Sequence, residues 1–243
     1  MAVDRARRPV VRTGTRAAEH HARRHNRRLV RRHARTFRNN KIVIAECYGC
    51  DMTAVPEWMR PPRPRWYADD LDALPQAPRH TELIDGALVF MMSPQRAWHG
   101  RLVTALVVSL AEQAPPGIEV EREMTIRLDE RNRPEPDLLV TTAPYDPDRT
   151  YYKPGEVLLV VEVVSPESAH RDRTVKLRKY AEAGIAHYWR VEDEDGAPIV
   201  HTYELDTPTR SYAPTGIARD ELRRSAPFPI ELELNSLLPA RRS

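Results

Sequence analysis

Cysteine is scarce in this chain, and its absence from most of the sequence narrows the choice of compartment. The only two cysteines, Cys47 and Cys50, form a single Cys-x-x-Cys, so no disulfide can form beyond residue 50. A structural zinc site needs four ligands, and the nearby histidines match no zinc-finger spacing. We therefore interpret the pair as free thiols and expect a reducing, cytoplasmic compartment.

Long hydrophobic runs and two common catalytic motifs are also missing. No window approaches the roughly 18 uninterrupted apolar residues that a membrane-spanning helix needs, so no membrane partner is expected. The chain has no Gly-rich loop ending in Gly-Lys-Ser/Thr and no Gly-x-Ser-x-Gly. These absences argue against an ATP-driven enzyme and against a serine hydrolase.

The formal net charge of +3 hides two regions of opposite sign. Residues 1–51 contain 14 Lys and Arg against 4 Asp and Glu, a net charge of +10; the remaining 24 and 31 give residues 52–243 a net charge of −7. The first region is too poor in apolar residues to bury a core, so we predict a disordered basic extension. Its origin is open: an artefact of the start site, with Met52 as the natural one, a nucleic-acid-binding arm or a targeting segment.

Hydrophobic periodicity over residues 52–243 predicts one domain of the α/β (α+β) class, a mixed central β-sheet flanked by helices. Asp69 or Asp70 is expected to cap a short helix. The remaining predicted elements are a hairpin over residues 82–92 around Asp85-Gly86, a helix over 100–113, a strand over 118–128, a strand beginning at Asp137, a strand over 157–164, a helix over 168–183 with Val175, Leu177, Tyr180 and Ala181 as core positions, a strand over 186–191, a hairpin over 198–213 and a strand over 229–234.

Two of these strands carry a carboxylate where burial should be costly. Asp137 opens the segment Pro136-Asp137-Leu138-Leu139-Val140, and Glu162 lies within the apolar run of residues 157–164. A buried carboxylate needs a cation, a hydrogen-bond network or a shifted pKa. Taken alone, Asp137 could cap a turn and Glu162 could form a structural ion pair. Together they suggest a site for Mg²⁺ or Mn²⁺, which prefer oxygen ligands.

The helix that follows offers a cation to the same site. Asp172 and Lys176 are four residues apart, so they share one helix face, and Tyr180 lies one turn further along it. An exposed Asp–Lys pair would stabilise the helix only weakly. The alternative is that Lys176 reaches the carboxylates, orients an attacking water and stabilises the negative charge of a phosphoryl transition state.

In their order along the chain, these segments resemble the Uma-two-type restriction endonuclease family of the PD-(D/E)XK nuclease superfamily. The segments that carry the resemblance are Glu82-Leu83-Ile84-Asp85-Gly86, Met92-Ser93-Pro94 with His99, Pro136-Asp137, the run from Val161 to Pro166, Asp172-x3-Lys176-x3-Tyr180-Ala181 with Ala183-Gly184-Ile185, and Tyr188-Trp189. The match covers about residues 65–234. It implies a restriction endonuclease-like core, a divalent metal and hydrolysis of phosphodiester bonds.

The resemblance also implies roles for individual residues. Asp137 and Glu162 would be the metal ligands, and Glu82 an upstream acidic residue of the catalytic set. The superfamily's lysine position, two residues after Glu162, holds Val164. Lys176 matches the family's own Asp-x3-Lys and takes the missing role. The residues expected to support this set are His99, Ser165, Asp172 and Tyr180.

Three functions remain in competition at this level. The first is a Mg²⁺-dependent DNA endonuclease, expected to act as a homodimer so that two sites address two strands. The second is a catalytically silent nuclease fold that binds nucleic acid or regulates, for which Val164 argues. The third is a metal-dependent hydrolase of another phosphate substrate, such as RNA. The acidic balance of residues 52–243 argues against broad, non-specific DNA binding.

Overall fold

A computed structural model describes residues 56–91 and 95–239 of the chain. The predicted basic extension, the cysteine pair and the Ser93-Pro94 step lie outside these residues.

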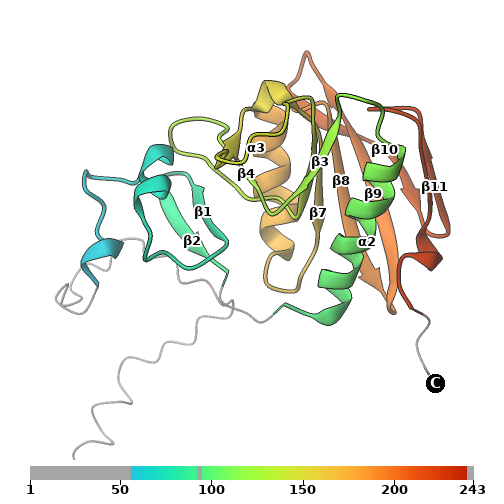
Figure 1. Cartoon of the computed structure of the whole chain (residues 1–243), viewed down its shortest axis with the longest axis horizontal. Helices are drawn as coiled ribbons and strands as arrows, with labels where there is room; N and C mark the ends of the chain where they lie inside the picture. The colour runs from blue at the N-terminus through green and yellow to red at the C-terminus, as the bar shows by residue number, and fades with distance from the viewer. Residues whose placement is uncertain (1–55, 92–94, 240–243) are drawn as a thin grey trace, which may run out of the picture. The chain divides into compact units, whose positions relative to one another are not determined.

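The centre of the domain is a six-stranded sheet with the order β10-β9-β8-β7-β5-β3 (Figure 1). Only β7 and β8 run parallel, and the other neighbours are antiparallel. A parallel pair needs a crossover connection, which the helical segment between β7 and β8 supplies. The predicted mixed sheet is thus confirmed. Its strands are β3 (Glu119–Arg122), β5 (Leu138–Thr141), β7 (Val157–Val163), β8 (His187–Glu194), β9 (Ala197–Asp206) and β10 (Ser211–Ala218).

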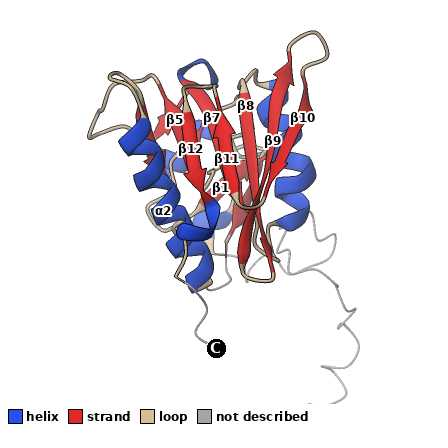
Figure 2. Ribbon diagram, turned by 90° about the vertical axis from the view of Figure 1, so that its right-hand side faces the viewer, coloured by secondary structure: helices blue, strands red, loops and turns tan. Residues whose placement is uncertain are grey.

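Helices cover both faces of this sheet, as Figure 2 shows. Helix α2 (Ala97–Gln113) packs on one face, together with the hairpin of β11 (Glu221–Arg224) and β12 (Ile230–Glu233). Helix α3 (Lys176–Glu182) packs on the other. Apolar side chains alternate between the two cores, because successive residues of a strand point to opposite faces.

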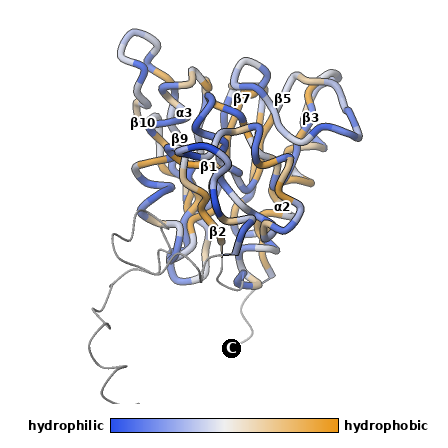
Figure 3. The backbone as a smooth tube through the Cα atoms, turned by 90° about the vertical axis from the view of Figure 1, so that its left-hand side faces the viewer, coloured by the Kyte–Doolittle hydropathy of each residue, from blue (hydrophilic) through white to orange (hydrophobic). Residues whose placement is uncertain are grey.

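The alternation is clearest in β7, which is central and almost wholly apolar. Val161 and Val163 belong to the core under α2, whereas Val160 belongs to the core under α3. Glu162 therefore points to the α3 face. Figure 3 shows the same division along the chain, with hydrophobic stretches in the central strands and hydrophilic turns at their ends.

The segment before α3 differs from the single helix predicted over residues 168–183. Residues Arg171–Val175 (η5) form a π-helical turn, and the regular helix begins at Lys176. Short π-helical turns inside helices are frequent at functional sites, and composition does not reveal them. Tyr180 and Ala181 are buried as predicted, whereas Val175 and Leu177 are only half-buried.

A second, smaller layer lies beside α3 and carries the predicted hairpin. Strands β1 (Thr81–Ile84) and β2 (Ala87–Phe90) pair through Asp85 and Gly86, whose φ angles are 54° and 79°. Two positive φ angles define the tight turn that favours Asp-Gly. The short helix before the hairpin, η3 (Ala68–Ala73), is capped by Tyr67, and Asp70 accepts a hydrogen bond from the Tyr67 amide at 2.8 Å. The prediction that Asp69 or Asp70 caps this helix is thus confirmed for Asp70, which acts from the third helical position while Tyr67 is the N-cap residue.

Other predicted boundaries also moved. The strand predicted over residues 118–128 is broken at Glu123, which has a φ of 53°, so that β3 ends there and β4 (Thr125–Ile126) turns away to pair with β6 (Tyr151–Tyr152). Strands β6 and β11 were not predicted, because two-residue and highly charged strands lack a period-two pattern. The remaining short elements are η2 (Glu57–Met59), η4 (Pro154–Glu156) and η6 (Leu234–Ser236). In the described part of the chain, no helix is long and apolar enough to cross a membrane.

Candidate active site

Neighbouring ends of β5 and β7 bring Asp137 and Glu162 together. The ladder pairs Leu138 with Val161, and extending this register by one residue places Asp137 opposite Glu162. Side chains directly opposite each other in an antiparallel pair are neighbours on the same face. Oδ2 of Asp137 accepts a hydrogen bond from the Val163 amide at 2.7 Å, which fixes the carboxylate across the strand end.

Lys176 reaches this site from the α3 face. Its ammonium lies 2.7 Å from Oε1 of Glu162, 2.8 Å from Oε1 of Glu82 and 4.0 Å from Oδ1 of Asp172. It also donates to the carbonyl of Glu135 at 2.9 Å. Position 164 holds no lysine, and the main chain there continues its pairing with β8 through the Val164 amide and the Val191 carbonyl. The ammonium therefore reaches Glu162 from the neighbouring helix instead of from β7.

Glu82 enters the cluster from the smaller layer. Its Oε1 accepts from the Glu135 amide at 3.0 Å as well as from Lys176. Its Oε2 is buried and has no hydrogen-bond donor among the described residues. The Nε of Arg171 lies 3.8 Å from Oε2 without forming a hydrogen bond. Glu82 is therefore held on one oxygen and incompletely compensated on the other.

Burial and neighbouring charges perturb the ionisation of Glu162, Asp172 and Lys176. Loss of hydration raises the pKa of Glu162 well above its usual range, against the opposing charge of Lys176. The same loss raises the pKa of Asp172 to about 6. Burial alone would lower the pKa of Lys176, but Glu162, Glu82 and Asp172 outweigh it and raise that pKa. Lys176 consequently stays protonated at neutral pH and cannot act as a base there.

The carboxylates outnumber the cations in this region. Among the described residues, Glu82, Glu162 and Asp172 share Lys176 and the more distant Arg171, Asp137 faces His99, and Oδ1 of Asp172 is a second buried oxygen without a donor. Such an excess of negative charge is stable only if protons or an added cation compensate it. No cluster of three or more His, Cys, Asp or Glu side chains, among the described residues, forms a ready-made metal cage.

His99 lies in α2 and contacts the site from the opposite side. Sequence patterning placed it before a helix of residues 100–113, but α2 begins at Ala97, so His99 is in its first turn. Its Nε2 is 3.1 Å from Oδ1 of Asp137, and its Nδ1 is 2.9 Å from the side-chain nitrogen Nε2 of Gln95. Burial opposes protonation of His99, but the hydrogen bond and charge of Asp137 outweigh it and raise the pKa.

The three other supporting residues have different surroundings. The Tyr180 hydroxyl donates to Oε1 of Glu162 at 2.9 Å, so Tyr180 and Lys176 hold the same oxygen. Asp172 lies beside Lys176 as described above. Ser165 instead exchanges hydrogen bonds with Ser168 at 3.0 Å, and none of its hydrogen bonds reaches the carboxylates of the described cluster. Ser165 shapes the turn between β7 and η5.

Sequence reasoning missed two groups near the cluster. Arg171 was not among the predicted site residues, although its side chain is buried beside Glu82 and its guanidinium donates to the Met91 sulfur. His80 was not considered, although its Nδ1 faces Oε1 of Glu135. The only hint of His80 in the sequence was its position two residues before Glu82. The Pro-rich segment before it has no hydrophobic periodicity from which a strand or helix could be predicted.

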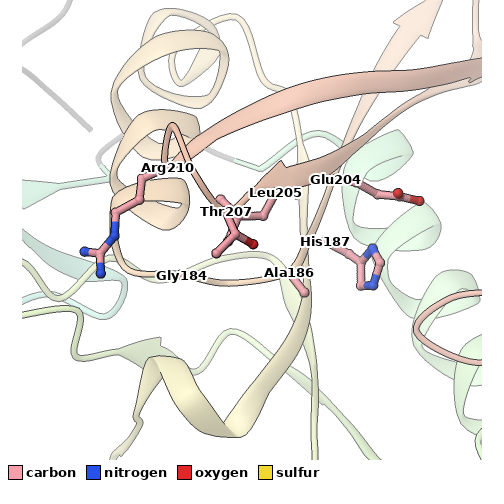
Figure 4. Close-up of a pocket in the computed structure, with 7 residues that line it drawn as sticks. All are labelled: Gly184, Ala186, His187, Glu204, Leu205, Thr207 and Arg210. Atoms are coloured by element: carbon pink, nitrogen blue, oxygen red, sulfur yellow. The ribbon is translucent and has the colours of Figure 1, made fainter.

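A separate pocket lies at the other end of β8 and β9 (Figure 4). It is lined in part by Gly184, His187, Glu204 and Arg210, and Arg210 donates to the Glu182 carbonyl at 3.3 Å. None of the carboxylates of the Lys176 cluster lines it. The candidate catalytic residues therefore lie at the other end of the sheet from this pocket, where β5 begins and β7 ends.

A mixed sheet flanked by helices, with two carboxylates at adjacent strand ends and a buried lysine, defines a restriction endonuclease-like fold. The chain belongs to the Uma2 family, whose description is "Putative restriction endonuclease" and whose model matches residues 68–237. The predicted family resemblance is thus confirmed, and membership supports a nuclease function.

A solved structure from Anabaena variabilis ATCC 29413, described as "a putative nuclease belonging to DUF820", has the same fold. The similarity covers 70% of this chain and 95% of that one, with a TM-score of 0.54 and 16% sequence identity. At this identity the likeness concerns the fold alone. A search among proteins of curated function finds no match.

Proposed function

We propose that the protein is a metal-dependent endonuclease that hydrolyses phosphodiester bonds of DNA at Glu82, Asp137, Glu162 and Lys176. The observation that carries the proposal is the position of the Lys176 ammonium, 2.7 Å from Glu162 and 2.8 Å from Glu82. Lys176 thus contacts the two acidic side chains at hydrogen-bond distance, although the superfamily's usual lysine position, residue 164, holds valine.

Asp137 and Glu162 are the residues that would hold Mg²⁺ or Mn²⁺. The donor set fits such an ion, because Mg²⁺ usually keeps several waters and takes only one or two protein carboxylates. The buried oxygens without donors on Glu82 and Asp172 indicate negative charge that a cation would compensate. A bound ion supplies Lewis acidity to a phosphoryl oxygen and lowers the pKa of water.

The protein's own groups divide the remaining work. Lys176, held protonated by its carboxylate neighbours, places a fixed positive charge where the phosphoryl group gains negative charge. Tyr180 and the Glu135 carbonyl hold Glu162 and Lys176 in position through the hydrogen bonds described above. His99 orients Asp137 from α2. Asp172, next to Lys176, is a supporting group in this scheme.

Cleavage of plasmid, single-stranded DNA and RNA by the full chain tests this proposal, with Mg²⁺, Mn²⁺ or EDTA present. We expect DNA cleavage that requires metal and that Asp137→Asn lowers at least about 10²-fold, since metal-assisted stabilisation contributes several kcal/mol. Glu112→Gln, which changes an exposed residue of α2, is the matched control and should cleave normally. Cleavage that persists in Asp137→Asn would contradict the site assignment, and cleavage of RNA alone would change the substrate.

The alternative is a catalytically silent protein that binds nucleic acid or regulates. Val164 is the observation that favours it, because the position at which the superfamily has a lysine holds an uncharged residue. A folded protein that cuts no substrate with any metal would support this alternative. Retention of DNA on such a protein, measured by fluorescence anisotropy, would separate binding from regulation.

Two further parts of the proposal concern the setting of the enzyme. We expect a homodimer, in which two sites address the two strands of a duplex, and sedimentation equilibrium would measure this directly. We expect a cytoplasmic location, because the chain has no cysteine after residue 50 that a secreted protein could use for a disulfide.

A further inference from the structure

His80 is held at the edge of the proposed active site in an unusual conformation. Its φ angle is 60°, in the left-handed region, which non-glycine residues seldom occupy although His is among those that tolerate it. The Thr81 hydroxyl donates to the Pro78 carbonyl and closes the turn around it. The His80 side chain is 46% exposed, whereas Glu135 beside it is 14% exposed. Unusual backbone conformations of this kind cluster at functional sites.

The ring of His80 is oriented by a carboxylate. Nδ1 faces Oε1 of Glu135 at 2.5 Å, and no other described residue hydrogen-bonds to this imidazole. With Nδ1 donating its proton to Glu135, Nε2 is the nitrogen left to exchange a proton with solvent or a bound substrate. A carboxylate that fixes one ring nitrogen and leaves the other available is the arrangement of a histidine that transfers protons.

Glu135 connects this pair to the buried cluster. Its amide donates to Glu82 at 3.0 Å, and its carbonyl accepts from Lys176 at 2.9 Å, so its main chain belongs to the site. Its side chain points instead to His80. The charged groups that act on Glu135 are His80, Glu82 and Lys176. The His80–Glu135 pair therefore lies between solvent and the carboxylate cluster.

Hydrolysis of a phosphodiester needs a proton at the departing oxygen. Water attacks phosphorus, the new P–O bond forms, and the bond to the departing bridging oxygen breaks. That oxygen leaves as an alkoxide unless it receives a proton. Lys176 is bound by three hydrogen-bond acceptors and its ammonium is stabilised by them, so it is a poor donor for this step.

We infer that His80, oriented by Glu135, is the general acid that protonates the departing oxygen. Nε2–H gives its proton to that oxygen as the P–O bond breaks, and solvent restores the proton to the ring. The inference rests on the proposed nuclease function and assigns a catalytic residue to it. Glu135 is a positioning residue, because it acts through His80.

DNA with sulfur at one bridging position separates this role from a structural one. A thiolate leaves without a proton, because thiols are far more acidic than alcohols. His80→Asn keeps a residue that tolerates the left-handed conformation. We expect it to lower cleavage of ordinary DNA by about 10²-fold or more, and cleavage of DNA with sulfur as the leaving atom by less than about threefold.

Two bridging positions, one control variant and one variant of the positioning residue complete the experiment. Rescue should occur with sulfur at only one of the 3′ and 5′ positions, which also identifies the departing atom. His187→Asn is the matched control; His187 pairs with Leu159, three residues before Glu162 and about 10 Å along the strand, and should cleave both substrates normally. Glu135→Gln should resemble His80→Asn more weakly.

The outcomes distinguish the inference from the function on which it rests. Wild-type cleavage with equal losses on oxygen and sulfur substrates, or no loss in His80→Asn, would overturn the role of His80 while the nuclease stands. Failure of the wild-type protein to cleave either substrate would overturn both. A loss confined to the oxygen substrate supports the general acid.

Discussion

Two ion-pair clusters in the same domain, each built around a buried cation, differ in how completely their polar groups are satisfied. Arg133 uses all of its nitrogens: it forms two hydrogen bonds with Asp72 at 2.8 and 2.9 Å and others with Thr125 and with the Ala68 and Thr150 carbonyls. The Lys176 cluster has more carboxylates than cations and leaves an oxygen of Glu82 and one of Asp172 without donors in the described chain.

We interpret this difference as that between a structural cluster and the proposed functional one. A buried charge with complete hydrogen bonding fixes local geometry, and Arg133 ties η3 to the β4–β6 layer in this way. A cluster with unpaired acidic oxygens costs folding free energy, so its persistence indicates a role for the charge itself. We expect substitutions of acids in the Lys176 cluster to lower activity without lowering stability, and substitution of the acid in the Arg133 cluster to lower stability without lowering activity.

The largest effect is expected from neutralising one acid in each cluster. Glu162→Gln should reduce cleavage at least about 10²-fold by removing a metal ligand. It should also raise stability at pH 7.5, because burial penalises the ionised form of Glu162. Asp72→Asn should leave cleavage per folded molecule unchanged but lower stability by about 2 kcal/mol. Denaturant unfolding measures the stability of each variant, and initial rates measure its cleavage. Two variants that change stability and cleavage in the same way would refute the distinction between the clusters.

Removing the central cation should have its main effect on stability. Lys176→Met leaves Glu82 and Glu162 buried without their closest positive charge, which should cost about 3–5 kcal/mol at pH 7.5. The cost should shrink at pH 5, since the pKa of Glu162 is raised and its carboxyl takes up a proton as the pH falls. Arg133→Met is the comparison; its loss should depend less on pH. Equal pH dependence for both variants would count against the excess of acidic charge.

The smallest effect should come from Asp172→Asn. The pKa of Asp172 rises from 3.8 to about 6 through burial, so the folded state binds this proton more tightly than the unfolded state. Wild-type stability therefore falls as pH rises from about 4 to 6, by at most about 3 kcal/mol. The variant should be more stable than wild type at pH 7.5 and equal to it near pH 3.5. Thermal melts across this range check the sign, and a less stable variant at pH 7.5 would show that Asp172 is a net stabilising charge.

Much of the sheet could be predicted because its strands are apolar and its turns carry strong signals. Asp85-Gly86 identifies the hairpin, and the run of residues 157–164 identifies β7. The break at Glu123 and the π-helical turn before Lys176 could not be predicted, since both depend on how the chain packs on the finished sheet. Neither the break nor the π-helical turn can be inferred from amino-acid composition.

The candidate residues followed from chemistry that is local to the sequence, and their partners did not. Asp137, Glu162 and Lys176 are conspicuous because a charge lies in an apolar strand or on a repeated helix face. The contacts of Glu82 with Lys176 and of His99 with Asp137 join segments more than 30 residues apart. Ser165 follows Glu162 closely in sequence, but the turn directs its hydroxyl to Ser168.

Calorimetric titration of the full chain with Mn²⁺ tests the central claim most directly, because it asks for a cation without requiring cleavage. We expect saturable binding that Asp137→Asn abolishes and that Asp72→Asn retains. The bound ion should also raise the melting temperature of the wild-type protein. A folded wild-type protein that shows no binding, or binding that survives in Asp137→Asn, would contradict a metal site at Asp137 and Glu162.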